Sequence, residues 1–257
     1  MNRIIKTFET LKSSGRKGLV GYMTAGDPDA DTSLKNILAA VEHGLDVLEL
    51  GIPFSDPTAD GPTIQEASQR ALAGGMTVRG ALQLVRELRN ESDIPIVLFG
   101  YSNPYFLYGY DALCADAADA GADGMLVVDM PFEESGEMQV DMDSHGLLRI
   151  PLIAPTTSPE RAAAILEQAK GFVYYIMITG VTGARDTVAQ DVSAHVAALR
   201  QCTDIPVAVG FGISNGDQAR QVAESADAIV VGSALVKASQ DGSLAELVKE
   251  LRGALVV

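Results

Sequence analysis

The chain has no tryptophan, only two cysteines and three histidines among 257 residues, and aromatic residues make up 5% of it. Cys114 and Cys202 lie far apart in helix-like segments, which suits a reducing compartment better than a disulfide scaffold. No apolar run approaches the length of a membrane span. Lys6 and Glu9 interrupt the stretch that a secretory signal would need to keep apolar. These absences predict a soluble, cytoplasmic protein.

Positive charge is also scarce, since 19 Lys and Arg stand against 34 Asp and Glu and the net charge is −15. This balance disfavours nucleic acid and anionic membranes, because both bind clustered cations. The histidines lie singly in helix-like segments, so we expect no metal site. No lysine ends a predicted strand, as Schiff-base chemistry would need, and no dinucleotide fingerprint follows the first strand. We therefore expect no cofactor in this chain, although backbone amides could bind a small anion.

Short apolar runs, each followed by a helical pattern, recur along the whole sequence. The eight runs are Leu19–Thr24, Val47–Leu50, Ile94–Phe99, Gly124–Val128, Leu148–Ile153, Phe172–Ile176, Pro206–Val209 and Ala228–Val231. Eight strand–helix alternations in a chain of this length predict a closed (β/α)8 TIM barrel. A doubly wound open sheet is the structural alternative. No linker divides the chain, so residues 1–257 are expected to form a single domain.

Two further helical regions lie outside the regular alternation. One extra helix is predicted at the N-terminus, over Ile4–Ser13. After the second strand, Thr63–Ala73 and Val78–Arg89 are predicted as separate helices joined at Gly74 and Gly75. The expected fold is therefore a barrel with an N-terminal helix and one additional helix after strand two.

The stretch from Leu48 to Ala67, LELGIPFSDPTADGPTIQEA, carries the strongest chemical signal. In a buried parallel strand Glu49 stands where an apolar residue would pack better, and burial raises the pKa of a carboxylic acid. A carboxyl group that is protonated near neutral pH is a candidate general acid or base. Asp60 follows on a proline-rich loop, which puts two carboxylates at one strand end.

Glycine clusters follow the last three predicted strands. They are Gly180 to Gly183, Gly210 to Gly212, and Gly232 with Ser233. Glycine lets backbone N–H groups approach an anion, and the helix that follows adds its positive N-terminal end. Because barrels often hold phosphate after their late strands, these clusters predict a phosphorylated substrate.

Each of these residues is also open to a structural interpretation. Glu49 could be held by backbone amides, and Asp60 could simply cap the helix that follows it. Only one of Tyr174 and Tyr175 can face inward, and either could belong to the core. Four residues at strand ends could fill the barrel or line a pocket for a flat aromatic substrate. They are Tyr22, Tyr101, Leu126 and Phe211.

Seven segments of the chain match the motifs of one known family. They are TAGDP (Thr24 to Pro28), LELGIPFSDPTADGPTIQ (Leu48 to Gln65), SNPYFLYG (Ser102 to Gly109), APTTSPER (Ala154 to Arg161), GVTGAR (Gly180 to Arg185), GFGIS (Gly210 to Ser214) and VVGSALVK (Val230 to Lys237). Through them the chain resembles the tryptophan synthase alpha subunit over nearly its whole length.

The resemblance implies a lyase of L-tryptophan biosynthesis that cleaves indole-3-glycerol phosphate to indole and D-glyceraldehyde 3-phosphate. In this retro-aldol reaction a neutral Glu49 would protonate C3 of the indole. Anionic Asp60 would stabilise or accept the ring N–H proton, and ionised Glu49 would then take the proton of the glycerol hydroxyl. The family's active-site tyrosine matches Tyr174.

Further positions carry over from the family's motifs. Its phosphate-binding positions match Gly183, Gly210, Gly212, Gly232 and Ser233. Residues around its indole ring match Tyr22, Tyr101, Leu126 and Phe211. Thr182 lies in a loop that folds over the substrate in the family. The chain departs from the family at three positions, which bear on pocket shape and loop closure. They are Gly21, Gly100 and Met177.

The resemblance also implies a partner, a beta subunit that holds pyridoxal phosphate and receives indole directly in an α2β2 assembly. The loop around Pro53 and Asp56 and the segment from Ser102 to Gly109 are the surfaces expected at that contact. Two alternatives remain: a free-standing lyase that releases indole, and a catalytically weak subunit that mainly activates a beta partner. A generic phosphate-sugar isomerase would not explain the segment from Leu48 to Gln65.

Overall fold

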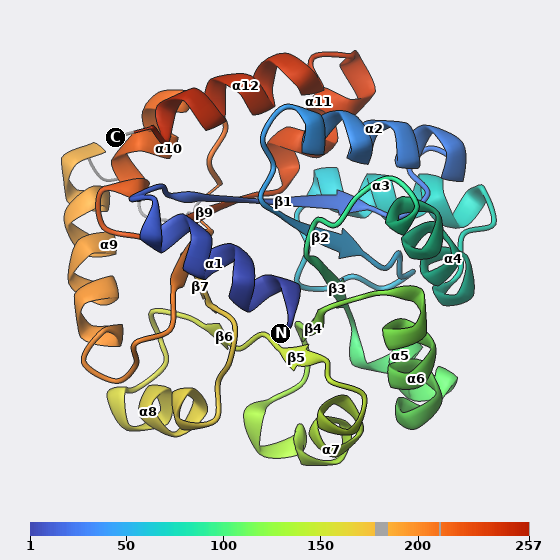
Figure 1. The fold of residues 1–257 in the computed structure, drawn as a ribbon, viewed down its shortest axis with the longest axis horizontal. Helices are drawn as coiled ribbons and strands as arrows, with labels where there is room; N and C mark the ends of the chain where they lie inside the picture. Colours follow the sequence, from blue (N-terminus) through green and yellow to red (C-terminus); the bar gives the residue numbers. More distant parts are fainter. Residues whose placement is uncertain (178–184, 211, 257) are drawn as a thin grey trace.

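The computed structural model of the chain describes residues 1–177, 185–210 and 212–256, with the backbone alone for 185–191. Its strands lie in the middle and the helices surround them, while α1 (Arg3–Ser13) crosses in front of the strands (Figure 1). Within the described part of the chain, no helix combines the length and apolar character that crossing a membrane requires.

The strands form one parallel sheet in the order β5-β4-β3-β2-β1-β9-β8-β7-β6. The strands are β1 (Gly18–Thr24), β2 (Val47–Gly51), β3 (Ile96–Gly100), β4 (Gly124–Val127), β5 (Leu148–Arg149), β6 (Leu152–Ile153), β7 (Val173–Ile176), β8 (Val207–Gly210) and β9 (Ala228–Val231). The other helices are α2 (Ala30–Glu42), α3 (Pro62–Ala73), α4 (Val78–Arg89), α5 (Ser102–Tyr108), α6 (Tyr110–Ala120), α7 (Gly136–Ser144), α8 (Pro159–Glu167), α9 (Arg185–Leu199), α10 (Gly216–Ala223), α11 (Ser233–Asp241) and α12 (Leu244–Ala254), with a 3-10 turn, η1, at Phe132–Glu134.

The segment that holds β5 and β6 completes the ring of strands. Ile150 N donates to the carbonyl of Met125 in β4 (2.9 Å), and Tyr174 N in β7 donates to the carbonyl of Pro151 (2.9 Å). The prediction of one continuous strand over Leu148–Ile153 is wrong in this detail, because Pro151 has no N–H with which to continue the ladder. The eight-stranded (β/α)8 barrel is confirmed, and the open-sheet alternative is wrong.

The interior of the ring is closed at one end by α1. Ile4, Phe8 and Leu11 of this helix are buried in one cluster with inward-facing strand residues such as Val20 and Val47. Side chains alternate along a strand, so Leu48 and Leu50 pack instead in the larger cluster between sheet and helices. The predicted N-terminal helix is therefore confirmed, and it seals the bottom of the barrel.

The helices after β2 are confirmed as α3 and α4, close to their predicted bounds. The pair α5 and α6 after β3 was not predicted as two helices. Gly109 separates them with φ +90°, a backbone conformation that favours glycine. Across that break the ring of Phe106 in α5 still meets Tyr110 of α6, with 6.0 Å between ring centroids.

Three aspartates repeat one arrangement at the start of three of the barrel strands. Asp46, Asp123 and Asp227 directly precede β2, β4 and β9. Each carboxylate accepts the N–H of a residue in or next to the neighbouring strand and pairs with an arginine. The bonds are Leu19 N to Asp46 (2.8 Å), Ile96 N to Asp123 (2.9 Å), Val207 N to Asp227 (2.9 Å), Arg252 to Asp46 (2.6 Å), Arg89 to Asp123 (2.8 Å) and Arg200 to Asp227 (3.0 Å). These aspartate clamps fix strand pairs at the end of the barrel opposite the candidate site.

The clamp at Asp123 is the most deeply buried. Its side chain is 3% exposed and that of its partner Arg89 is 11% exposed, whereas Asp227 is 39% exposed. We expect Asp123→Asn to lower the free energy of unfolding by about 3 kcal/mol or more, because it leaves the buried guanidinium without its counter-charge. Asp227→Asn should cost about 1 kcal/mol or less. Urea unfolding of the two variants measures the difference, and equal losses would contradict this ranking.

Candidate active site

Glu49 lies inside the barrel in the middle of β2. It stands between Tyr22 of β1 and Val97 of β3 in the strand register and is fully buried. Neither carboxylate oxygen has a hydrogen-bond partner among the described residues. The alternative interpretation, in which backbone amides hold the Glu49 carboxylate, is therefore not supported by the described residues. Burial without a compensating partner raises the pKa of Glu49 to about 8, so the group is mostly neutral at pH 7.

Asp60 lies at the end of the loop that joins β2 to α3. Its N–H donates to the carbonyl of Pro57 (3.0 Å), and its own carbonyl accepts from Gln65 Nε2 (2.8 Å). The N-cap of α3 is Gly61, with no side-chain cap, so the Asp60 carboxylate does not cap this helix. Burial raises the pKa of Asp60 to about 6, and the nearby Tyr101 hydroxyl acts in the opposite direction.

Tyr101 ties this loop to the end of β3. Its hydroxyl accepts the N–H of Ala59 (3.0 Å), and its ring packs on Phe54 with 5.3 Å between the ring centroids. Both contacts are made to the loop that carries Asp60. Tyr101 therefore helps to hold the loop that carries the second carboxylate.

Tyr22 and Tyr174 bring the two carboxylates into one site. Glu49 and Asp60 both raise the pKa of each tyrosine through their charge, in addition to the larger effect of burial. Both carboxylates are therefore within electrostatic reach of both rings. Tyr174 packs against the inner cluster, whereas Tyr175 is buried with the outer one, so the inward-facing tyrosine is Tyr174.

Two glycines make room for these tyrosines. A Cβ on Gly210 of β8 would lie 2.6 Å from the Tyr174 hydroxyl, and a Cβ on Gly51 of β2 would overlap the hydroxyl of Tyr22. Gly210 therefore has a steric role beside Tyr174 in addition to any contact with phosphate. The sequence did not identify Gly51 as a site residue. Its only signal there is its position in the strand, two residues after Glu49.

Apolar side chains surround the tyrosine ring on β1. Leu126 of β4 is fully buried in the inner cluster. Phe99 of β3 meets Tyr22 edge-on at 5.1 Å between ring centroids, and Ile64 of α3 packs in the same group. Phe99 and Ile64 were also missed. The two-residue period from Val97 could have found Phe99, whereas nothing in the sequence places Ile64.

The glycine-rich end of the site lies at the start of α11. Gly212, Gly232 and Ser233 line one cavity of about 560 Å³, together with Lys237, one helical turn further along. Gly212 has φ +63°, which favours glycine, and Gly232 is the N-cap of α11. Free backbone N–H groups at a helix N-terminus suit an anion.

Not every predicted residue joins this arrangement. Gly210 is buried in β8 and does not line the cavity at α11. Thr182, Gly183 and Phe211 lie outside the described residues. Among the described residues no group of His, Cys, Asp and Glu could hold a metal ion.

The three departures from the family's motifs point away from the pocket. A Cβ on Gly21 would meet Leu45 and Leu235, and one on Gly100 would meet the hydroxyl of Tyr105. Those neighbours and Met177 all belong to the outer cluster between sheet and helices. In the part of the chain that the structure describes, these positions therefore face the outer packing and not the inner cluster.

Comparison with known proteins agrees with this geometry. The family model described as tryptophan synthase alpha chain matches residues 8–253. A tryptophan synthase alpha chain of Geobacter sulfurreducens is 51% identical over 98% of this chain and 95% of its own length. The tryptophan synthase subunit alpha of Legionella pneumophila superposes with a TM-score of 0.92 at 39% identity, over 99% of this chain and 98% of that one. A chain of tryptophan synthase from M. tuberculosis gives a TM-score of 0.92 at 36% identity, over 100% and 99%. The chain belongs to the tryptophan synthase alpha chain family.

Proposed function

We propose that this chain cleaves indole-3-glycerol phosphate to indole and D-glyceraldehyde 3-phosphate with Glu49 and Asp60 as its acid–base pair. The observation that carries this proposal is the contrast between the two carboxyl groups. Glu49 is fully buried with its pKa raised to about 8, and Asp60 is half-buried with its pKa raised only to about 6. At pH 7 one is mostly neutral and the other mostly ionised, which is the pairing that the reaction needs.

The first step is protonation of the indole ring. Indole is a poor leaving group until C3 carries a proton, and neutral Glu49 supplies it. The positive charge that develops on the ring acidifies the N–H, and anionic Asp60 stabilises or accepts that proton. Because Asp60 is half-buried, its charge acts on the ring with less screening than it would have in bulk water.

The second step is cleavage of the bond between indole C3 and the glycerol carbon. Glu49, now ionised, takes the proton of the adjacent hydroxyl. The electrons of that O–H bond form the aldehyde, and the electrons of the C–C bond return to the indole ring. The net movement is one proton from hydroxyl to C3, so no redox partner or cofactor is consumed.

The remaining site residues bind the two ends of the substrate. We assign the indole ring to the pocket of Tyr22, Tyr101, Leu126 and Phe211, beside Tyr174. We assign the phosphate to Gly183, Gly210, Gly212, Gly232 and Ser233, with Thr182 in the loop that closes over it. The cavity at Gly212, Gly232 and Ser233 supports the phosphate end.

We also propose a beta subunit as partner, in an α2β2 assembly in which the beta subunit alone holds pyridoxal phosphate. The neighbour from M. tuberculosis is a chain of tryptophan synthase. In the segment from Ser102 to Gly109, Phe106 and Leu107 are 66% and 76% exposed, unusual for large apolar side chains. We expect residues 1–257 to fold as one domain and to work in the cytoplasm without a cofactor of their own.

Removing either acidic group tests the proposed roles. We expect Glu49→Gln and Asp60→Asn each to lower kcat for indole release by about 100-fold or more, the usual scale of a general acid–base group. Indole release from indole-3-glycerol phosphate should be measured with and without a beta subunit. High turnover of the wild type alone would favour the free-standing lyase, and inactivity of the purified complex would favour a subunit that only activates its partner.

Asp56→Asn is the matched control, because Asp56 is an exposed carboxylate on the same loop. Without a beta subunit it should release indole at the wild-type rate. Near-normal turnover by Glu49→Gln would remove the mechanism even if the chain still binds substrate.

The activity should have a maximum in pH. The reactive form needs neutral Glu49 and ionised Asp60, so kcat/KM should fall below about pH 6 as Asp60 is protonated and above about pH 8 as Glu49 ionises. The apparent pKa values belong to the pair. A pH profile of kcat/KM measures both limbs, and the residual activity of Asp60→Asn should lose the acid limb. A flat profile between about pH 5 and 9 would be inconsistent with this pair.

Burial also makes Glu49 a pH-dependent cost to folding. The folded chain binds more protons than the unfolded chain between the usual pKa of 4.5 and the raised value of about 8, so stability falls as pH rises through that window. Glu49→Gln removes this titration. As pH rises from about 5 to 9, its free energy of unfolding should therefore increase relative to that of wild type, by on the order of a few kcal/mol. Urea unfolding across pH measures it. The exposed control Glu91→Gln should follow wild type, and a pH-independent difference for Glu49→Gln would refute the assignment.

A further inference from the structure

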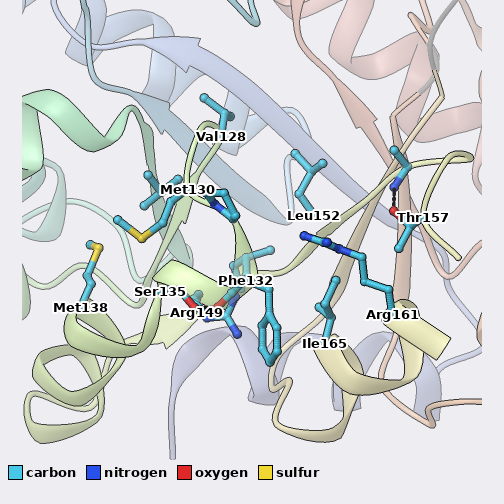
Figure 2. Close-up of a pocket in the computed structure, with 14 residues that line it drawn as sticks. Val128, Met130, Phe132, Ser135, Met138, Arg149, Leu152, Thr157, Arg161 and Ile165 are labelled. Atoms are coloured by element: carbon cyan, nitrogen blue, oxygen red, sulfur yellow. Dashed lines mark hydrogen bonds between the residues drawn. The ribbon is translucent and has the colours of Figure 1, made fainter. Parts of the chain in front are cut away.

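A second cavity lies beside the segment that carries β5 and β6, between α7 and α8. Figure 2 shows the side chains that line it, and its volume is about 160 Å³. None of the carboxylates, tyrosines or glycines of the candidate active site lines it. Val128 and Leu152 border it and also pack against the inner cluster, so they separate it from the active site.

The walls of this cavity are mostly apolar. They include Met130, Pro131, Phe132, Met138, Ile150 and Ile165. Its volume is close to that of an apolar cavity of about 150 Å³ that takes up one benzene molecule in another protein. The cavity is therefore the size of a single aromatic ring.

Arg149 lies between this apolar space and a neighbouring hollow that Gln139 and Asp143 line, and it brings a positive charge to both. Its Nε donates to the neutral Oε1 of Gln139 (2.7 Å), and its guanidinium lies over the ring of Phe132, 5.2 Å from the centroid. Burial lowers its pKa. The charge of Asp143 raises the pKa of Arg149 and so acts against the effect of burial. Among the described residues, however, no carboxylate lies within 4.0 Å of the Arg149 guanidinium, the limit for an ion pair.

Other arginines of similar burial are paired with a carboxylate. The side chains of Arg89 and Arg252 are 11% and 13% exposed, and each lies within 2.8 Å of an aspartate. A partly buried guanidinium is strongly stabilised by a carboxylate that accepts two parallel hydrogen bonds. Arg149 is thus the partly buried arginine whose counter-charge the described part of the chain does not supply.

A second arginine stands at the rim of the same cavity. Arg161 of α8 extends toward the space between Leu152 and Ile165 (Figure 2) and pairs with Glu133 at 2.8 Å. Both side chains of this pair are about half exposed, 48% and 55%, so the pair can open at little cost. Two guanidinium groups at one cavity make it locally positive, although the chain as a whole has a net charge of −15.

We propose that this cavity binds a small carboxylic acid with one flat apolar ring. The ring fills the space beside Phe132 and Ile165, and the carboxylate supplies the missing counter-charge of Arg149. Arg161 guides the anion at the rim and can exchange Glu133 for it. A neutral ring of the same shape should bind more weakly, because it leaves Arg149 unpaired.

Benzoate is the probe, titrated into the full chain and followed by ligand-observed NMR. We expect saturable binding that Arg149→Gln weakens by about tenfold or more, the usual scale for a hydrogen bond to a charged group. Benzamide should bind wild type correspondingly more weakly than benzoate. Arg161→Gln, at a half-exposed position that should not disturb the fold, should weaken benzoate binding by a smaller factor.

The matched control is Arg220→Gln, which makes the same charge change in α10, on the other side of the barrel from α7 and α8 (Figure 1). It should bind benzoate like wild type. Absence of saturable binding, equal affinity for benzamide, or equal weakening by Arg220→Gln would overturn the proposal. Competitive displacement of benzoate by indole would assign the ring to the active-site pocket and overturn it as well.

Discussion

The central constraint on this molecule is an ionisable side chain that is buried inside a barrel among apolar neighbours. Glu49 is fully buried, and no described residue donates a hydrogen bond to it. Such a group destabilises the fold in proportion to how far its pKa is raised. The apolar residues buried in the rest of the interior, among them Ile4, Phe8 and Leu11 of α1, offset this cost.

The two ends of the barrel treat the same residue types in opposite ways. At the α1 end Asp46, Asp123 and Asp227 each accept a strand N–H and pair with an arginine, so their charges are neutralised and fix strand pairs. Further along the strands, no residue that the structure describes hydrogen-bonds to Glu49, and the Tyr101 hydroxyl lies near Asp60. The aspartate clamps thus tie neighbouring strands together at one end, while the carboxyl groups that we propose for catalysis carry none of that pairing.

The sequence predicted what depends on periodicity and on residue type within one segment. Alternation in β2 put Glu49 inward, and helical spacing found α3 and α4. It did not predict the split at Pro151, the break at Gly109 or the aspartate clamps, because each depends on which distant backbone group lies opposite. Arg149 was invisible for the same reason: a missing counter-charge can be recognised only once its surroundings are known. Tertiary pairing, not local pattern, decides these features.

The departures from the family's motifs show how strand alternation separates two kinds of constraint. Gly21 and Gly100 follow or precede inward-facing aromatics, yet their missing Cβ atoms face Leu45, Leu235 and Tyr105 on the helix side. A change there alters how helices seat on the outside of the barrel. On the inner side, Tyr22 and Phe99 meet edge-on with 5.1 Å between ring centroids. Because side chains alternate along a strand, a different residue at Gly21 or Gly100 adds atoms to the outer packing and not to the barrel interior.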